Sequence, residues 1–79
     1  MSEAIAAQIK NAIVDAIPDA QVEVSLGSPG HYALVVASGT FEGKTLLAKQ
    51  RLVLSPLKTL MAGDNAPVHA IDSIETRSL

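Results

Sequence analysis

Two histidines, His31 and His69, are the side chains of this 79-residue chain that are best suited to proton transfer or metal binding. Because the chain has no cysteine, they are also its only strong ligands for a soft or borderline metal ion. Each lies at a predicted loop–strand boundary, and the two would approach each other if those strands shared a sheet. Two imidazoles cannot complete a tetrahedral zinc site, so a second molecule would have to bring the other ligands. A histidine at such a boundary can equally be a residue that only packs or forms hydrogen bonds.

The sequence argues against catalysis by these histidines. A histidine-activated serine needs an acid that orients the imidazole and donors for an oxyanion, and Asp72 and Ser73, which follow His69, have no spacing that supplies them. Asp72 is expected to be a solvent-facing charge on a strand. No pair of carboxylates in a cleft is indicated either. We therefore predict that the protein is not an enzyme.

The stretch SGTFEGKT (38–45) is similar to a nucleotide-binding P-loop but is one residue too short. A P-loop has four residues between its first glycine and Gly-Lys-Thr, whereas only three separate Gly39 from Gly43. The chain is also too short for the extended parallel sheet that usually lies behind such a loop. The stretch is better interpreted as a turn after a strand, with Lys44 opening a helix.

Charge is unevenly distributed along the chain. The net charge is −2, with six basic and eight acidic residues, yet the segment between Gly43 and Gly63 contains four bases and no acid. We call these four residues the basic island: Lys44, Lys49, Arg51 and Lys58. Such a run is commonly a solvated face, and otherwise it docks an anionic ligand or partner. On a net acidic protein, four bases predict only weak, salt-sensitive contact with DNA phosphates.

The length and composition predict one small domain over residues 1–79. Hydrophobic residues make up 48% of the chain, and Tyr32 and Phe41 are the only aromatic ones, so the core must be aliphatic. No signal-peptide pattern is present, and no apolar run approaches the ~18 residues of a membrane span. We expect a soluble, cytoplasmic protein that does not bind membranes and is a monomer or a weak homodimer on its own.

Hydrophobic spacing predicts a helix followed by two strands. The helix extends from an N-cap at Ser2 to the breaker Pro18, because isoleucines recur every four residues at positions 5, 9, 13 and 17. QVEVSL (21–26) alternates as a half-buried strand does. GSPG (27–30) breaks the pattern, and HYALVVAS (31–38) carries apolar residues on both faces, which is typical of a central strand.

The second half predicts two helices and a third strand. The first of these helices starts at Lys44, with its apolar side formed by Leu46, Leu47, Gln50 and Leu54. Ser55 followed by Pro56 predicts the N-cap of a short second helix that ends at Gly63, followed by a DNAP loop. VHAIDSIE (68–75) carries Val, Ala and two Ile residues in a pattern that predicts a third strand.

The resulting order is α-β-β-α-α-β, an α+β fold in which helices pack on one face of a three-stranded mixed sheet. This order is similar to the type II KH arrangement, and GSPG has the Gly-x-x-Gly pattern of KH domains. In KH domains, however, that loop joins two helices, whereas here it joins two strands. The turn between the helices, LSPL (54–57), has no glycine. The order of elements therefore resembles that of a KH domain, but the glycine-containing loop that binds nucleic acid in KH domains is not at the corresponding place.

An ordered set of short motifs resembles the BolA family. HYALVVASGTFEGKTLLAKQRLVLSPL (31–57) and VHAIDSIET (68–76) contain a histidine at the end of a hairpin loop, a strand, Phe-x-Gly, a basic-Gln-basic triplet on a helix, and Val-His-Ala at the last strand. The matching positions are His31, Phe41, Gly43, Lys49-Gln50-Arg51 and Val68-His69-Ala70. The resemblance covers about residues 22–76. The short GSPGH loop is more similar to the YrbA-like branch than to BolA proper, whose hairpin loop is longer.

The resemblance implies a KH-like fold and a non-enzymatic adaptor that pairs with a monothiol glutaredoxin. Such pairs are understood to share a glutathione-dependent [2Fe–2S] cluster in iron sensing or iron–sulfur assembly, and no cluster is expected in the isolated protein. The ligand positions of the family correspond to His69 and His31. Family proteins have also been proposed as DNA-binding regulators that act through the helix-turn-helix region, and the basic island is compatible with that alternative.

The composition supports the adaptor interpretation on one point. A chain without cysteine cannot hold an iron–sulfur cluster by itself, but it can supply imidazoles to one iron while thiolates of a partner and of glutathione serve the rest. Neutral histidine in place of thiolate should raise the reduction potential and allow protonation to displace the ligand. We therefore predict a labile, pH-sensitive mixed complex. The basic island is a further candidate for docking anionic glutathione or an acidic partner surface.

Overall fold

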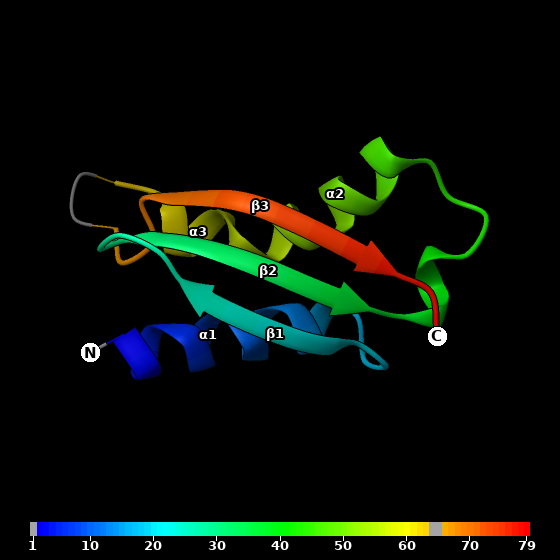
Figure 1. Cartoon of the computed structure of the whole chain (residues 1–79), viewed down its shortest axis with the longest axis horizontal. Coiled ribbons are helices and arrows are strands. Elements are labelled where there is room, and N and C mark those ends of the chain that lie inside the picture. The colour runs from blue at the N-terminus through cyan, green and yellow to red at the C-terminus, as the bar shows by residue number, and fades with distance from the viewer. Residues whose placement is uncertain (1, 64–65) are drawn as a thin grey trace.

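The computed structural model describes residues 2–63 and 66–79 and has helices on one face of a three-stranded sheet (Figure 1). Its elements, in chain order, are α1 (Ser2–Ala16), β1 (Gln21–Leu26), β2 (His31–Ala37), the 3-10 helix η1 (Gly39–Phe41), α2 (Leu46–Leu54), the 3-10 helix η2 (Ser55–Leu57), α3 (Lys58–Met61) and β3 (Ala70–Arg77). The predicted α+β class and the α-β-β-α-α-β order are confirmed. None of the helices described is long and apolar enough to cross a membrane.

Strand β2 is the central strand, as its apolar sequence predicts. It pairs antiparallel with β1 through the GSPG hairpin and parallel with β3, so the sheet is mixed. The parallel register places His31 opposite Ala70 and Tyr32 opposite Ile71, but Ala33 opposite Ser73. Asp72 is thus an extra residue in β3, which is the arrangement of a β-bulge.

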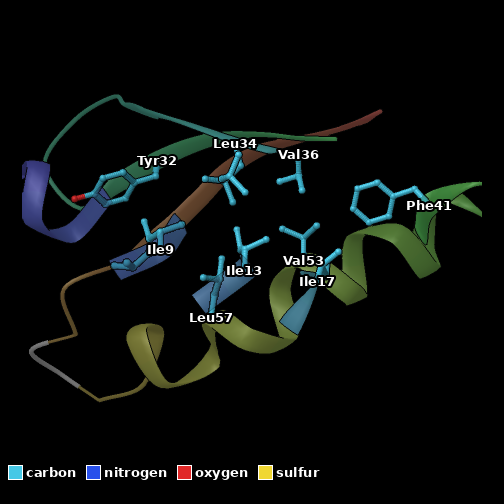
Figure 2. Close-up of a cluster of buried hydrophobic side chains, with 11 residues drawn as sticks. Ile9, Ile13, Ile17, Tyr32, Leu34, Val36, Phe41, Val53 and Leu57 are labelled. Carbon is cyan, nitrogen blue, oxygen red and sulfur yellow. The ribbon is translucent and has the colours of Figure 1, made fainter. Parts of the chain in front are cut away.

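The core lies between the helices and one face of the sheet (Figure 2). Alternate residues of β2 are buried against the helices, namely Tyr32, Leu34 and Val36. They meet the isoleucine stripe of α1, of which Ile9, Ile13 and Ile17 are buried and Ile5 is partly buried. The α1 prediction is therefore confirmed for its apolar face. The helix begins at Ser2, whose side chain lies outside the part of the structure that is described, as do residues 64 and 65 of the predicted DNAP loop.

The predicted apolar face of α2 is wrong at Leu46 and Leu47, whereas Gln50 and Leu54 are partly buried. The side chains of Leu46 and Leu47 are 62% and 57% exposed, whereas Val53 and Leu57 are fully buried. The helix starts two residues later than predicted, because the hydroxyl of Thr45 caps it by accepting a hydrogen bond from the Ala48 N–H at 3.2 Å. Leu46 and Leu47 therefore lie in the exposed first turn of α2, and only the later part of the helix packs on the core.

The predicted N-cap at Ser55 is also wrong. Ser55 has helical dihedral angles (φ −54°, ψ −49°), and its N–H donates to the carbonyl of Arg51. Pro56 occupies the first turn of η2, where its missing N–H costs no hydrogen bond, so the chain passes from α2 to α3 through one 3-10 turn. After α3, Gly63 has the positive φ (+88°) that its predicted role as a helix-terminating glycine requires.

A polar contact not predicted from the sequence holds the far end of β2. Ser38 is fully buried; its hydroxyl donates to Asp19 Oδ1 at 2.5 Å and accepts from the Thr40 N–H at 3.0 Å. The Gly39 N–H donates to Asp19 Oδ2 at 2.9 Å. Asp19 thereby links the α1–β1 connection to η1, and η1 places Phe41 in the core.

Candidate functional site at the histidine end of the sheet

The structure brings His31 and His69 to the same end of the sheet. His31 is the first residue of β2, and His69 directly precedes β3. Because β2 and β3 run parallel and side by side, both strands start at the end that carries the GSPG hairpin (Figure 1). His69 is exposed and His31 is partly exposed, so both remain accessible to a second molecule.

Gly30 determines how closely His69 can approach the hairpin. Its carbonyl oxygen accepts hydrogen bonds from the N–H groups of His69 at 2.9 Å and Ala70 at 3.1 Å. A Cβ atom on Gly30 would lie 2.2 Å from Cδ2 of the His69 ring, and the φ of Gly30 is +79°. Both the space and the backbone conformation therefore require glycine here. The GSPG hairpin thus places the His69 ring against Gly30, the residue directly before His31 and the start of β2.

His31 has a carboxylate neighbour, Asp72. Nδ1 of His31 lies 3.0 Å from Oδ1 of Asp72, and the two side chains are 41% and 53% exposed. The hairpin packs close to the same carboxylate, since a Cβ atom on Gly27 would lie 3.7 Å from Asp72 Oδ2. Asp72 is exposed, as predicted, but its pairing with His31 was not predicted. The pairing depends on the parallel register and on the bulge, neither of which has a local sequence signal.

The donor set of this end is two imidazoles and one paired carboxylate. Among the described residues, no group of three or more His, Cys, Asp or Glu side chains is arranged to hold a metal ion. Two accessible imidazoles at the starts of adjacent strands suit a borderline metal ion as part of its ligand set. The geometry therefore fits a half-site, in which a second molecule supplies the other ligands.

The basic island is divided in the structure. Lys44 and Arg51 line a groove of about 610 Å³, together with Ala16, Ile17, Ala48, Leu52, Ser55 and Pro56. Lys49 and Lys58 do not line this groove. The groove lies between the end of α1 and the segment that runs from Lys44 through α2 into η2. Figure 1 shows the end of α1 and helix α2 on the side of the molecule away from the start of β2. The elements that line the groove therefore lie away from the end of the sheet at which β2 and β3 start.

Comparisons with known proteins agree with this fold. The family model described as BolA-like protein matches residues 3–78. An uncharacterized protein in the rpoN-murA intergenic region of Acinetobacter guillouiae is 36% identical over 64 residues, which cover 81% of this chain and 74% of the relative.

Solved structures of BolA proteins are similar to the whole sheet-and-helix arrangement. The structure of a bolA protein homologue from Coxiella burnetii has a TM-score of 0.73 and 33% identity, and the match covers 91% of this chain and 87% of the other. BolA1 from Arabidopsis thaliana has a TM-score of 0.74 at 20% identity, with 92% and 89% of the two chains covered, and is therefore a likeness of fold. Assignment to the YrbA-like branch stays a prediction. With a family model that matches nearly its whole length, a 36% identical relative and the same fold as solved BolA structures, this chain belongs to the BolA-like family.

Proposed function

We propose that this protein is a non-enzymatic cytoplasmic adaptor that binds a monothiol glutaredoxin and supplies His69 and His31 to a shared, glutathione-dependent [2Fe–2S] cluster. The role we infer for the complex is in iron–sulfur assembly or iron sensing. The observation that carries the proposal is the placement of two accessible histidines at the starts of the adjacent strands β2 and β3, in a chain that has no cysteine. Membership of the BolA-like family supports it.

The histidines would have a defined part in such a complex. Iron–sulfur clusters are held mainly by thiolates, and histidine can replace cysteine on one of the two irons. His69 and His31 would serve that iron, while the glutaredoxin and glutathione would each contribute a thiolate to the other. Protonation of an imidazole removes the lone pair that binds the metal, so the histidines would make the complex sensitive to mild acid.

The proposal is tested by reconstitution of the mixed complex. The protein is combined with a monothiol glutaredoxin, glutathione, ferrous iron and a sulfide source without oxygen, and visible absorption and circular dichroism are compared with those of the glutaredoxin alone. We expect a new spectrum that elutes with a species of heterodimer size. An unchanged spectrum without co-elution would refute the proposal.

Ligand identity is tested by single substitutions in the same assay. We expect His69→Ala and His31→Ala each to change the visible circular dichroism and to shorten the lifetime of the mixed cluster. Gln8→Ala, at an exposed position on α1, is the control and should leave both unchanged. A mixed cluster with the wild-type spectrum and lifetime in His69→Ala would refute the assignment of His69 as a ligand.

The groove lined by Lys44 and Arg51 favours a second candidate function, contact with DNA phosphates as a transcriptional regulator. Neither residue forms an ion pair with the described part of the chain, so both are available to an anion. Binding to duplex DNA at low salt, retained in a variant that lacks both histidines, would support this function. Cluster formation lost in that variant, without DNA binding in the wild type, would support the adaptor alone.

A further inference from the structure

The pairing of His31 with Asp72 restricts where the imidazole can carry its proton. Among the described residues, the acidic group that contacts the ring is Asp72, whose Oδ1 lies 3.0 Å from Nδ1. An ionised carboxylate accepts hydrogen bonds and cannot donate them, so Nδ1 of a neutral ring must hold the proton in this contact. The lone pair is then on Nε2. Without the carboxylate, nothing among the hydrogen bonds of the described residues favours this tautomer.

We propose that Asp72 is a positioning residue that fixes His31 in the Nδ1–H tautomer and so makes Nε2 the ligating atom. This inference rests on the proposed function, because it assigns a role toward the shared cluster. Metal-binding histidines commonly donate their second ring N–H to a carboxylate, which fixes the tautomer and the ring orientation. Asp72 would be the carboxylate that fixes the tautomer and the ring orientation of His31.

The fold places Asp72 for this contact in two ways. The register of β2 and β3 shifts after Tyr32 and Ile71, so Asp72 has no partner residue in β2. Bulges of this kind commonly re-aim a side chain next to a functional site. The hairpin closes over the same carboxylate, with Gly27 close to Asp72 Oδ2. His31 and Asp72 are far apart in sequence, and the bulge and the hairpin together bring them into contact.

The charged neighbours of the pair offer a matched control. On the same strand, Glu75 is paired with Arg77 and is 56% exposed, close to the 53% of Asp72. Glu75→Gln therefore removes the same charge from β3 at a similar exposure without touching His31. Asp72→Asn keeps the shape of the side chain, but its amide can both donate and accept, so it no longer selects one tautomer. Asp72→Ala removes the contact altogether.

The first experiment measures the tautomer in the free protein. Long-range ¹H–¹⁵N correlation spectra are recorded at about pH 8.5, where an imidazole is neutral, and His31→Ala identifies the ring signals. We expect Nδ1 of His31 to be protonated in the wild type and in Glu75→Gln, and the proton to move toward Nε2 in Asp72→Asn and Asp72→Ala. A wild-type His31 with its proton on Nε2, or an unchanged tautomer in both Asp72 variants, would overturn the proposal.

The second experiment measures the lifetime of the mixed cluster after a chelator is added. We expect Asp72→Ala to lose the cluster about tenfold faster than wild type, at the lower end of the effect of such partners because the pair is half exposed. In a His31→Ala background, Asp72→Ala should have no further effect, since Asp72 acts through His31.

The two proposals fail in different ways. A cluster that forms in the wild type and has the same lifetime in Asp72→Ala would overturn the positioning role alone. A wild type that forms no cluster, although His31 has its proton on Nδ1, would overturn the proposed function and with it the role of His31 as a ligand.

Discussion

At the scale of single residues, Gly30 sets the position of His69. Its carbonyl binds the backbone on both sides of the start of β3, and its missing side chain leaves the space into which the His69 ring packs. Gly43 has a similar φ of +76°, but a Cβ atom there would meet nothing within 4 Å. The two glycines therefore share a backbone conformation that would strain any other residue, but only Gly30 has a side chain packed against it.

We predict that Gly30→Ala and Gly43→Ala both lower the free energy of unfolding by about 1–3 kcal/mol, because each forces alanine into a positive φ. Only Gly30→Ala should shift the ring signals of His69 and impair assembly of the mixed cluster. Urea unfolding measures the first effect, and NMR with reconstitution measures the second. Identical His69 signals in both variants would show that Gly30 does not hold the ring.

Asp19 is the residue whose charge we expect to matter most for pH-dependent stability. The hydroxyl of Ser38, and then the N–H of Gly39, hold the pKa of Asp19 below its usual value. A carboxyl group whose pKa is lowered by folding stabilises the protein above its unfolded pKa of about 3.9. That contribution is lost as the pH falls through the lower, folded pKa.

We predict that Asp19→Asn is less stable than the wild type at pH 7 and that the difference shrinks as the pH falls from about 4 to 2. Thermal unfolding at a series of pH values measures it. Asp15→Asn, at an exposed position of α1, is the control and should show no such convergence. A stability difference for Asp19→Asn that is independent of pH would contradict the role of the carboxylate charge.

At the scale of elements, α2 shows how packing decides which apolar residues are buried. Leucines lie at both ends of the helix, but only the end that continues into η2 packs on the core, where Val53 and Leu57 are buried. Leu46 and Leu47 in the first turn remain exposed, and Phe41 from η1 is buried in the core cluster.

The same substitution at the two ends tests this arrangement. We predict that Leu57→Ala lowers the free energy of unfolding by about 2–5 kcal/mol, because it empties a fully buried site. Leu47→Ala should change it by less than about 0.5 kcal/mol, because that side chain is 57% exposed. Urea denaturation compares them. Equal effects at both positions would show that the first turn of α2 also packs on the core.

At the scale of the whole molecule, the two candidate binding surfaces lie apart. The histidines lie at the hairpin end of the sheet, whereas the end of α1 and helix α2, which line the groove with Lys44 and Arg51, lie toward the other end (Figure 1). The two surfaces can therefore be altered independently.

We predict that Lys44→Glu combined with Arg51→Glu leaves the mixed cluster intact, because neither residue lies at the histidine end. If the groove contacts DNA, the slope of log K against log salt should fall in magnitude by about 2, one unit for each lost phosphate contact. Fluorescence anisotropy with a labelled duplex measures the slope. Lys10→Glu combined with Lys58→Glu, at two exposed positions outside the groove, makes the same change in net charge and is the control for charge alone. Loss of the mixed cluster in the double variant would show that the groove takes part in the adaptor complex.

The sequence by itself determined most of the secondary structure and the candidate ligands. Local patterns predicted these elements. The isoleucine spacing of α1, the alternation of β1 and the apolar run of β2 are typical of a helix, a half-buried strand and a central strand. The Gly and Pro residues of GSPG predicted the turn between the two strands. The absence of cysteine likewise left His31 and His69 as the ligand candidates. The start of α2 and the burial of Leu46 and Leu47 were predicted wrongly, because a cap and packing against the core decided them.

Only the tertiary structure decided how the site is assembled. The proximity of the two histidines requires β3 to lie parallel beside β2, and the contact of His31 with Asp72 requires a one-residue bulge between them. The division of the basic island depends on how the end of α1 lies beside α2 and η2. These are contacts between residues far apart in the chain, and they depend on strand register and helix packing, which no local hydrophobic period specifies.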